Sequence, residues 1–348
     1  MKILITGNLG YVGSELVKTI RRTYPSATII GYDSGFFAKQ LTNVFYSPDI
    51  YIDKQIYGDV RDFPKELLED VDTVVQLAAV SNDPIGNKFE KATFEINHEA
   101  VVDIAGKAKA MGVKNLVFAS SCSVYGFAEE DARIESSSLN PLTAYAKSKV
   151  ASENDLKLLA DDNFKITCLR FATACGMSDR LRLDLVLNDF VAGAMSSDEI
   201  TILSDGTPWR PLINVRDMGR AIIWAHERKP ESDGNFLITN TGSNIWNYQI
   251  KELAYAIKEL LPEVKVSINK DAQPDKRSYK VSFDLFKRLA PDYQPQYSLE
   301  DTIKDLVDGL TQINFKDKNF RQSRLMRLVV VNELLSNGIF DDSLRLVK

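Results

Sequence analysis

The chain has 348 residues and a formal net charge of −5, with 48 Asp and Glu residues against 43 Lys and Arg residues. This length predicts two domains or one large interleaved body. The composition, 44% hydrophobic and 26% charged, is that of a globular protein with enough apolar material for a core. The acidic balance argues against a general nucleic-acid binder, because such proteins carry a basic excess. An anionic ligand must therefore be held by a local group of basic residues.

The cysteine and histidine content indicates the compartment and the metal chemistry. Cys122, Cys168 and Cys175 form an odd set without a CxxC pair, and the two histidines lack the spacing of a zinc site. The N-terminal run MKILITG is too short for a signal peptide, and no stretch approaches the roughly 18 apolar residues of a membrane span. We therefore expect a cytoplasmic protein without a metal site that binds neither membrane nor nucleic acid.

Short apolar runs alternate with helical patterns through the first half of the chain. The apolar runs predict strands at 2–6, 27–33, 73–79, 115–121 and 164–171. Apolar residues at helical spacing predict helices over 90–111 and 143–160. Strands that alternate with helices form right-handed βαβ units and a parallel sheet. The prediction is an α/β fold with a Rossmann-type doubly wound parallel sheet.

Three glycines stand between the first predicted strand and the helix that follows it. Gly7, Gly10 and Gly13 suit a tight turn in which the backbone approaches a pyrophosphate and the helix N-terminus binds its oxygens. Asp33 ends the second strand, where a carboxylate accepts hydrogen bonds from both adenosine ribose hydroxyls and repels a 2′-phosphate. The sequence thus predicts NAD rather than NADP. The alternatives are a purely structural turn and, for Asp33, a helix cap.

Tyr145 and Lys149 lie at positions i and i+4 of the predicted helix 143–160, on one face. A phenol with a pKa near 10 is a poor base, but a nearby ammonium and the positive nicotinamide of NAD⁺ favour the phenolate. Tyr145 would then take a proton from a substrate hydroxyl while a hydride leaves the same carbon. Ser121, at the end of a strand, is suited to position that oxygen. The alternative is a solvated surface pair of Tyr and Lys.

Together, the glycine turn, Asp33, the SSCSVYG of 120–126 and the YxxxK of 145–149 resemble the extended short-chain dehydrogenases, specifically the nucleotide-sugar epimerase/dehydratase group. The resemblance covers nearly the whole chain. It implies a Ser121, Tyr145 and Lys149 catalytic triad, a homodimer, and a GDP-, UDP-, dTDP- or CDP-linked sugar as substrate. It also implies that Asn97 supports the site. The cofactor-binding residues expected from the turn and the resemblance are Gly7, Gly10, Tyr11, Val12, Asp33, Asp59, Val60, Leu77, Ala78, Ala79, Tyr145 and Lys149. Asp59 is equally suited to being a plain turn acid.

One departure from the family narrows the reaction. The 4,6-dehydratases of the group carry Thr-Asp-Glu where this chain has Ser-Cys-Ser at 121–123, so a carboxylate pair for water elimination is missing. That leaves simple redox at one carbon, which the resemblance implies is sugar C4, as in a 4-epimerase or a 4-dehydrogenase. An NAD(P)H-dependent reductase of 4-keto sugar nucleotides is the alternative, because the triad is the same.

The substrate-binding residues are expected in the second half of the chain. The segment 209–217 resembles a family motif whose arginine grips the substrate diphosphate, and Arg210 is the matching position. Arg180 and Arg277 are expected to add to this clamp, although each alone is suited to the surface. Thr173, also expected at the substrate, stands where UDP-galactose 4-epimerases have an asparagine, and this departure argues against UDP-glucose or UDP-galactose as the substrate. The segments 170–190 and 274–282 resemble a bacterial branch that includes dehydrogenases acting at C4 of GDP-heptose and deoxysugar nucleotides.

The strand and helix alternation becomes irregular after residue 171. We expect an NAD-binding domain of residues 1–171 and roughly 213–240, and a substrate lobe of 172–212 and 241–315. The amphipathic tail 316–348 either packs on its own body or forms a dimer contact, and Asn337-Gly338 resembles a helix stop.

Two other classes of function compete with this interpretation. A regulatory protein of this fold would bind the dinucleotide without catalysis, but such proteins lose the Tyr or the Lys, and both are present. An enzyme acting on a steroid or flavonoid ketone would not need Arg210 and the other lobe arginines.

Overall fold

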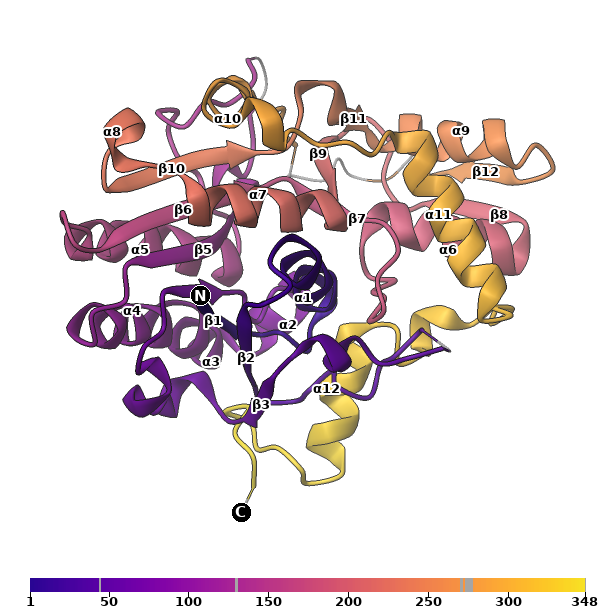
Figure 1. The fold of residues 1–348 in the computed structure, drawn as a ribbon. Helices are drawn as coiled ribbons and strands as arrows, with labels where there is room; N and C mark the ends of the chain where they lie inside the picture. The colour runs from indigo at the N-terminus through magenta and orange to yellow at the C-terminus, as the bar shows by residue number, and fades with distance from the viewer. Residues whose placement is uncertain (44, 129–130, 270–271, 273–277, 348) are drawn as a thin grey trace.

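The computed structural model describes residues 1–43, 45–128, 131–269, 272 and 278–347, and a seven-stranded sheet dominates this part of the chain (Figure 1). All its strands are parallel, in the order β10-β6-β5-β4-β1-β2-β3. The order runs outward in both directions from β1, so the sheet is doubly wound as predicted. The strands are β1 (Lys2–Thr6), β2 (Thr28–Asp33), β3 (Lys54–Tyr57), β4 (Thr73–Gln76), β5 (Asn115–Ser121), β6 (Lys165–Phe171) and β10 (Phe236–Thr241).

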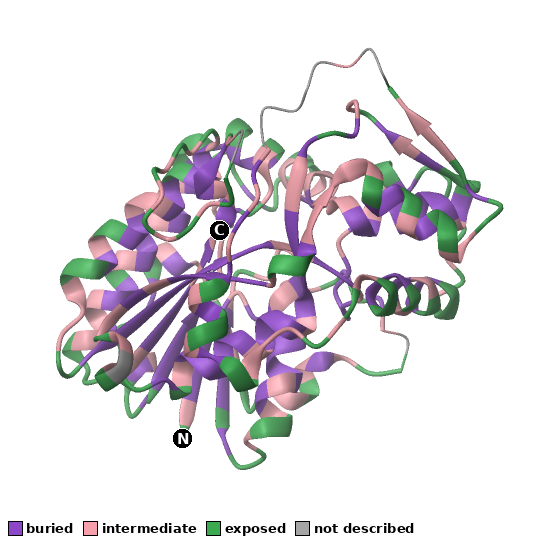
Figure 2. Cartoon of the chain, turned by 90° about the horizontal axis from the view of Figure 1, so that it is seen from above, coloured by how far each residue is buried: buried purple, intermediate pink, exposed green. Residues whose placement is uncertain are grey.

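Helices cover both faces of this sheet, and its strands are buried along most of their length (Figure 2). Ile3 and Ile5 of β1 enter one apolar core, while Leu4 enters the other, as the alternation of side chains along a strand requires. The first core packs under α1 (Tyr11–Thr23) and α7 (Val215–Glu227). The second packs under α4 (Ala100–Ala110) and α5 (Ala144–Leu159). Burial on both faces explains why these strands are continuous apolar runs.

The helix predicted over 90–111 is interrupted. It divides into α3 (Glu90–Phe94), a wider π-helical turn (Glu95–Glu99) and α4. Asn97 lies in this turn, where its side chain accepts from the Val80 amide (2.8 Å) and donates to the Val80 carbonyl (3.0 Å). The wide turn thus seats a buried amide that fastens the loop after β4, a use typical of π-helical turns near functional sites. The spacing of apolar residues in the sequence does not predict this π-helical turn.

A second lobe is built around a third apolar core. Its three-stranded sheet contains β7 (Thr173–Cys175), β9 (Trp209–Asn214) and β11 (Asn247–Gln249). A two-stranded sheet pairs β8 (Glu199–Ile202) with β12 (Lys265–Ile268). The main helices of the lobe are α6 (Val186–Ser197), α9 (Ile250–Leu260) and α11 (Leu299–Gln312). The remaining short helices lie outside this lobe: α2 (Asp83–Lys88) packs on α5, α10 (Asp284–Leu289) packs on β10, and α8 (Pro230–Asp233) precedes β10.

The end of the chain leaves α11 and returns to the β1–β3 side of the large sheet, where α12 (Arg327–Ser336) lies (yellow in Figure 1). Val331 and Leu344 join the second core of that sheet, so this segment packs on its own body. The helix ends before Gly338, whose φ of +64° is the left-handed conformation expected of the predicted stop.

All three cysteines are free and buried. Burial raises the pKa of each thiol, which leaves them protonated and unreactive. Within the described ranges, every helix is too short or too polar to cross a bilayer.

Candidate active site

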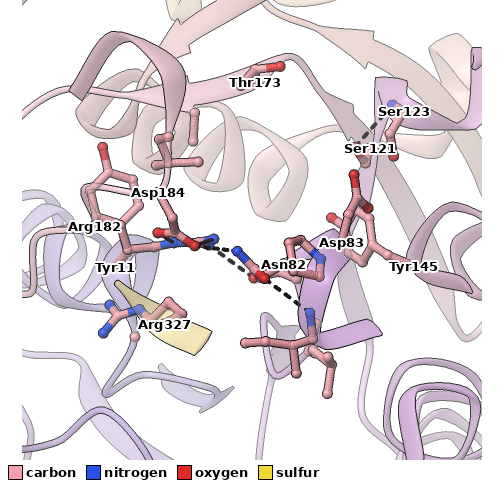
Figure 3. A pocket seen from close by; sticks show the side chains of 18 of the residues that line it. Tyr11, Asn82, Asp83, Ser121, Ser123, Tyr145, Thr173, Arg182, Asp184 and Arg327 are labelled. Carbon is pink, nitrogen blue, oxygen red and sulfur yellow. Dashed lines mark hydrogen bonds and ion pairs between the residues drawn. The ribbon is translucent and has the colours of Figure 1, made fainter. Parts of the chain in front are cut away.

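A cavity of about 830 Å³ lies where the carboxyl ends of the central strands face the second lobe. Ligands of doubly wound sheets bind at this edge. All the residues expected at the cofactor line this one cavity, and the triad residues line it too, with Ser121 and Tyr145 at one end (Figure 3). The expected cofactor residues are Gly7, Gly10, Tyr11, Val12, Asp33, Asp59, Val60, Leu77, Ala78, Ala79, Tyr145 and Lys149.

The glycine turn leaves no room for side chains where it meets the sheet. Gly7 has a φ of +78°, and a Cβ there would lie 2.5 Å from the Ala78 amide nitrogen. Gly10 caps α1 without a side-chain hydrogen bond, and no acidic residue lies in the first turn. The first N–H groups of the helix therefore face the cavity unblocked, and their partial positive charge fits a pyrophosphate.

Asp33 closes the adenosine side of the turn. Its two carboxylate oxygens accept from the amides of Leu9 (3.1 Å) and Gly35 (2.7 Å). Burial raises the pKa of Asp33, and these two amides oppose that rise. Each oxygen keeps a lone pair, so the orientation fits the ribose hydroxyls of NAD. Asp59, on the same side, accepts from the Arg61 amide and pairs with its guanidinium at 2.6 Å, so it both caps a turn and lines the cavity.

The Ser, Tyr and Lys of the predicted triad converge from two elements. Ser121 ends β5, where its Oγ accepts from the Ser123 amide (3.1 Å), and Tyr145 lies in the first turn of α5. Lys149 follows one turn later and is buried; its Nζ lies 5.5 Å from the centroid of the Tyr145 ring and 4.5 Å from that of Phe118. Thr143 caps α5 through the Ala146 amide (3.2 Å), which fixes where the helix begins and hence where Tyr145 points.

Burial perturbs both ionisable groups of this set. It raises the pKa of Tyr145 to about 12, a rise that the nearby Ser121 hydroxyl opposes and the negative charge of Asp83 adds to. Burial also lowers the pKa of Lys149 to about 7, against the attraction of Glu153. A lysine that titrates near neutral pH beside a buried tyrosine is a pattern of functional sites.

The expected substrate residues are placed differently from one another. Thr173 and Arg210 line the cavity, and the Arg210 guanidinium lies 5.8 Å from the Tyr279 ring centroid. Arg180 is not among the lining residues: its guanidinium is buried behind the glycine turn, paired with Asp49 at 2.9 Å. Arg277 lies outside the described residues.

Arg182, two residues beyond Arg180, faces the cavity instead. It forms a bidentate pair with Asp184 (3.0 and 2.9 Å), and Asp184 accepts from Asn82 at 2.5 Å (Figure 3). This network joins the loop after β4 to the second lobe. The sequence does not predict it, because Asn82 and Asp184 are far apart in the chain. Asn82 and Asp83 could have been predicted at the site, because they closely follow a predicted strand and therefore lie near the carboxyl edge of the sheet.

Comparison of the chain with known protein families, sequences and structures agrees with this geometry. The NAD dependent epimerase/dehydratase family matches residues 3–239. Protein CapI of Staphylococcus aureus is 25% identical over 343 residues, covering 88% of this chain and 98% of that protein. The UDP-glucose 4-epimerase of Lactobacillus helveticus is 27% identical over 229 residues, covering 62% and 67%. The structure of MoeE5 in complex with UDP-glucose and NAD has a TM-score of 0.75 at 20% identity, covering 90% and 99%.

The family match extends over most of the chain and includes the glycine turn, Asp33, Ser121, Tyr145 and Lys149. It confirms the predicted resemblance, and the turn and carboxylate that it includes have the geometry that a dinucleotide requires. The chain therefore belongs to the NAD dependent epimerase/dehydratase family and is an enzyme with NAD as its cofactor.

Proposed function

We propose that the chain oxidises the C4 hydroxyl of a nucleotide-linked sugar and acts as a 4-epimerase or a 4-dehydrogenase. The observation that carries the proposal is the placement of Ser121, Tyr145 and Lys149 in the cavity that also contains the glycine turn and Arg210. A sugar that reaches these three residues lies beside the dinucleotide and within the same enclosure as a phosphate-binding side chain.

Each residue of the triad has a separate task in this mechanism. NAD, when bound, supplies the hydride acceptor for the C4 hydrogen. Tyr145 takes the proton of the C4 hydroxyl, so that a carbonyl forms as both hydrogens leave. Ser121 hydrogen-bonds the same oxygen, and the positive charge of Lys149 stabilises the phenolate. An epimerase returns the hydride to the opposite face of the ketone, whereas a dehydrogenase releases the ketone.

The substrate class follows from the lobe side of the cavity. Arg210 offers a planar fork suited to a diphosphate, and Thr173 adds a hydroxyl. Because relatives are named for UDP-sugars, we propose a UDP-linked sugar first, with GDP-, dTDP- and CDP-sugars as the other candidates. We also propose a cytoplasmic homodimer formed through α4 and α5.

The direct test incubates the purified protein with UDP-, GDP-, dTDP- and CDP-hexoses and follows C4 by NMR. Inversion at C4 without added cofactor is expected of an epimerase, and a 4-keto product with accumulating NADH is expected of a dehydrogenase. Substrate deuterated at C4 should transfer its label to the nicotinamide. Steady NADH or NADPH consumption with a 4-keto sugar alone would instead identify a reductase, and no change at C4 with any sugar would contradict the proposal.

Asp83 should shift the pH dependence of this reaction. Its carboxylate raises the pKa of Tyr145, so Asp83→Asn should lower that pKa. A lower pKa gives more phenolate at a given pH, and the rising limb of log kcat/KM against pH should move to lower pH. The measurement is the pH profile of C4 oxidation for the wild type and the variant.

Glu90→Gln is the matched control for this shift, because Glu90 is an exposed carboxylate at the start of α3 and does not line the cavity. Its profile should coincide with that of the wild type. A limb that stays in place in D83N, or moves to higher pH, would contradict the assigned influence of Asp83 on Tyr145.

A further inference from the structure

The C-terminal tail, residues 316–347, forms one wall of the cofactor cavity. Six side chains of the tail line the cavity. They are Arg321, Met326, Arg327, Leu328, Val331 and Leu344. These residues lie far beyond the end of the matched family region at residue 239, so the tail adds a wall to the site from outside that region.

Two of the six are charged: Arg321 pairs with Asp189 at 2.7 Å, whereas Arg327 is 3% exposed. Its guanidinium lies 4.1 Å from the Phe37 ring centroid, and its Nη2 donates to the Arg180 carbonyl at 3.1 Å. Its Nη1 is buried and has no hydrogen-bond partner among the described residues. A buried guanidinium nitrogen without an acceptor is costly, which points to a ligand that supplies one. Figure 3 shows Arg327 on the tail, on the same side of the cavity as Tyr11 and Arg182.

The charges around Arg327 favour an anion. Arg182 and Arg180 repel it, Asp184 and Asp33 attract it, and burial with the two arginines lowers the pKa of Arg327 to about 9. Both carboxylates already accept hydrogen bonds elsewhere, Asp184 from Arg182 and Asp33 from two backbone amides. An anion beside the N-terminus of α1 would supply the missing acceptor and offset the repulsion.

The far end of the tail is fastened to the adenosine side of the cavity. Arg61, which also holds Asp59, donates to the carbonyls of Ser343 (2.7 Å) and Leu344 (2.9 Å). The ring of Phe340 packs edge-on against that of Phe36 at 4.3 Å, just after Asp33. The tail thus lies along the cavity from Arg327 to the residues expected at the adenine.

We propose that Arg327 binds the pyrophosphate of NAD and that the tail retains the cofactor on the enzyme. The pyrophosphate is the anionic part of NAD, and it is the group that the N-terminus of α1 is built to receive. The proposal rests on NAD as the cofactor and not on the C4 chemistry, so neither depends on the other.

The test compares Arg327→Gln with the wild type in cofactor retention and in ligand affinity. Loss of a charged hydrogen bond should weaken binding about 10- to 100-fold. We expect less NAD(H) per chain after gel filtration, faster NADH dissociation by fluorescence, and weaker ADP binding to cofactor-stripped protein by calorimetry. Adenosine, which lacks the phosphates, should bind within about twofold of wild type. Arg327→Lys, which keeps the charge and the aliphatic stem, should lose less and covers the case in which R327Q does not fold.

Arg324→Gln is the control, because Arg324 lies on the same tail but is exposed and pairs with Glu333 at 2.8 Å. It should retain NAD(H) like the wild type. Three results would overturn the proposal: unchanged NADH dissociation in both Arg327 variants, equal losses in R324Q, or weaker UDP binding with ADP binding intact. The last result would assign Arg327 to the substrate diphosphate.

Discussion

Tyr145→Phe is expected to reduce turnover about 10³-fold while NAD stays bound, within the range typical of losing a general acid–base group. The ring remains in the first turn of α5, so the shape of the cavity is kept. What is lost is the phenol oxygen that takes the substrate proton in our mechanism. The measurement is single-turnover reduction of bound NAD on addition of substrate, together with the NAD content of the purified variant.

Tyr125→Phe is the matched control, since Tyr125 is a buried tyrosine near Ser121 that does not line the cavity. Its hydroxyl donates to Asn240 at 2.7 Å, so its loss should cost about 1–3 kcal/mol of unfolding free energy and leave turnover nearly unchanged. Near-normal hydride transfer in Y145F would remove Tyr145 from the proposed mechanism. A loss of bound NAD in Y145F would show that the hydroxyl serves the cofactor rather than the proton transfer.

Gly7→Ala is expected to destabilise the protein by about 2–5 kcal/mol and to abolish NAD retention. The left-handed backbone costs a residue with Cβ about 1–2 kcal/mol, and the overlap adds about 1–3 kcal/mol. The overlap is with backbone, because the added Cβ would lie 2.5 Å from the Ala78 nitrogen. Relief therefore requires β1 and β4 to separate at the point where both contribute to the cofactor site. Denaturant unfolding and NAD content per chain measure the two effects.

Gly106→Ala is the matched control, because Gly106 lies inside α4 and an added Cβ would meet nothing within 4 Å. This change should stabilise the protein by about 0.5–1 kcal/mol, the ordinary difference between the two residues in a helix. If G7A retained NAD and unfolded like the wild type, the close approach of Gly7 to the Ala78 backbone would not constrain the turn.

The doubly wound sheet, the NAD-binding turn and the residues of the proposed triad could all be predicted from the amino-acid sequence. These features are local: a strand, its turn and the following helix are contiguous, and Tyr145 and Lys149 lie one turn apart on α5. In each case, the residues that form the feature lie within one short segment of the chain, so their spacing alone predicts it. Because parallel strands bring their carboxyl ends to one edge of the sheet, Asp33 and Ser121 are both expected at that edge.

Which distant residues complete the site depends on tertiary packing, and the sequence did not predict it. Arg180 and Arg182 are near neighbours in sequence, yet the first pairs with Asp49 behind the turn and the second faces the cavity. The contribution of Arg327 depends on a tail that returns across the sheet after the whole second lobe. Such contacts are set by the packing of segments far apart in the chain, and neither local propensity nor the spacing of a motif records which faces will meet.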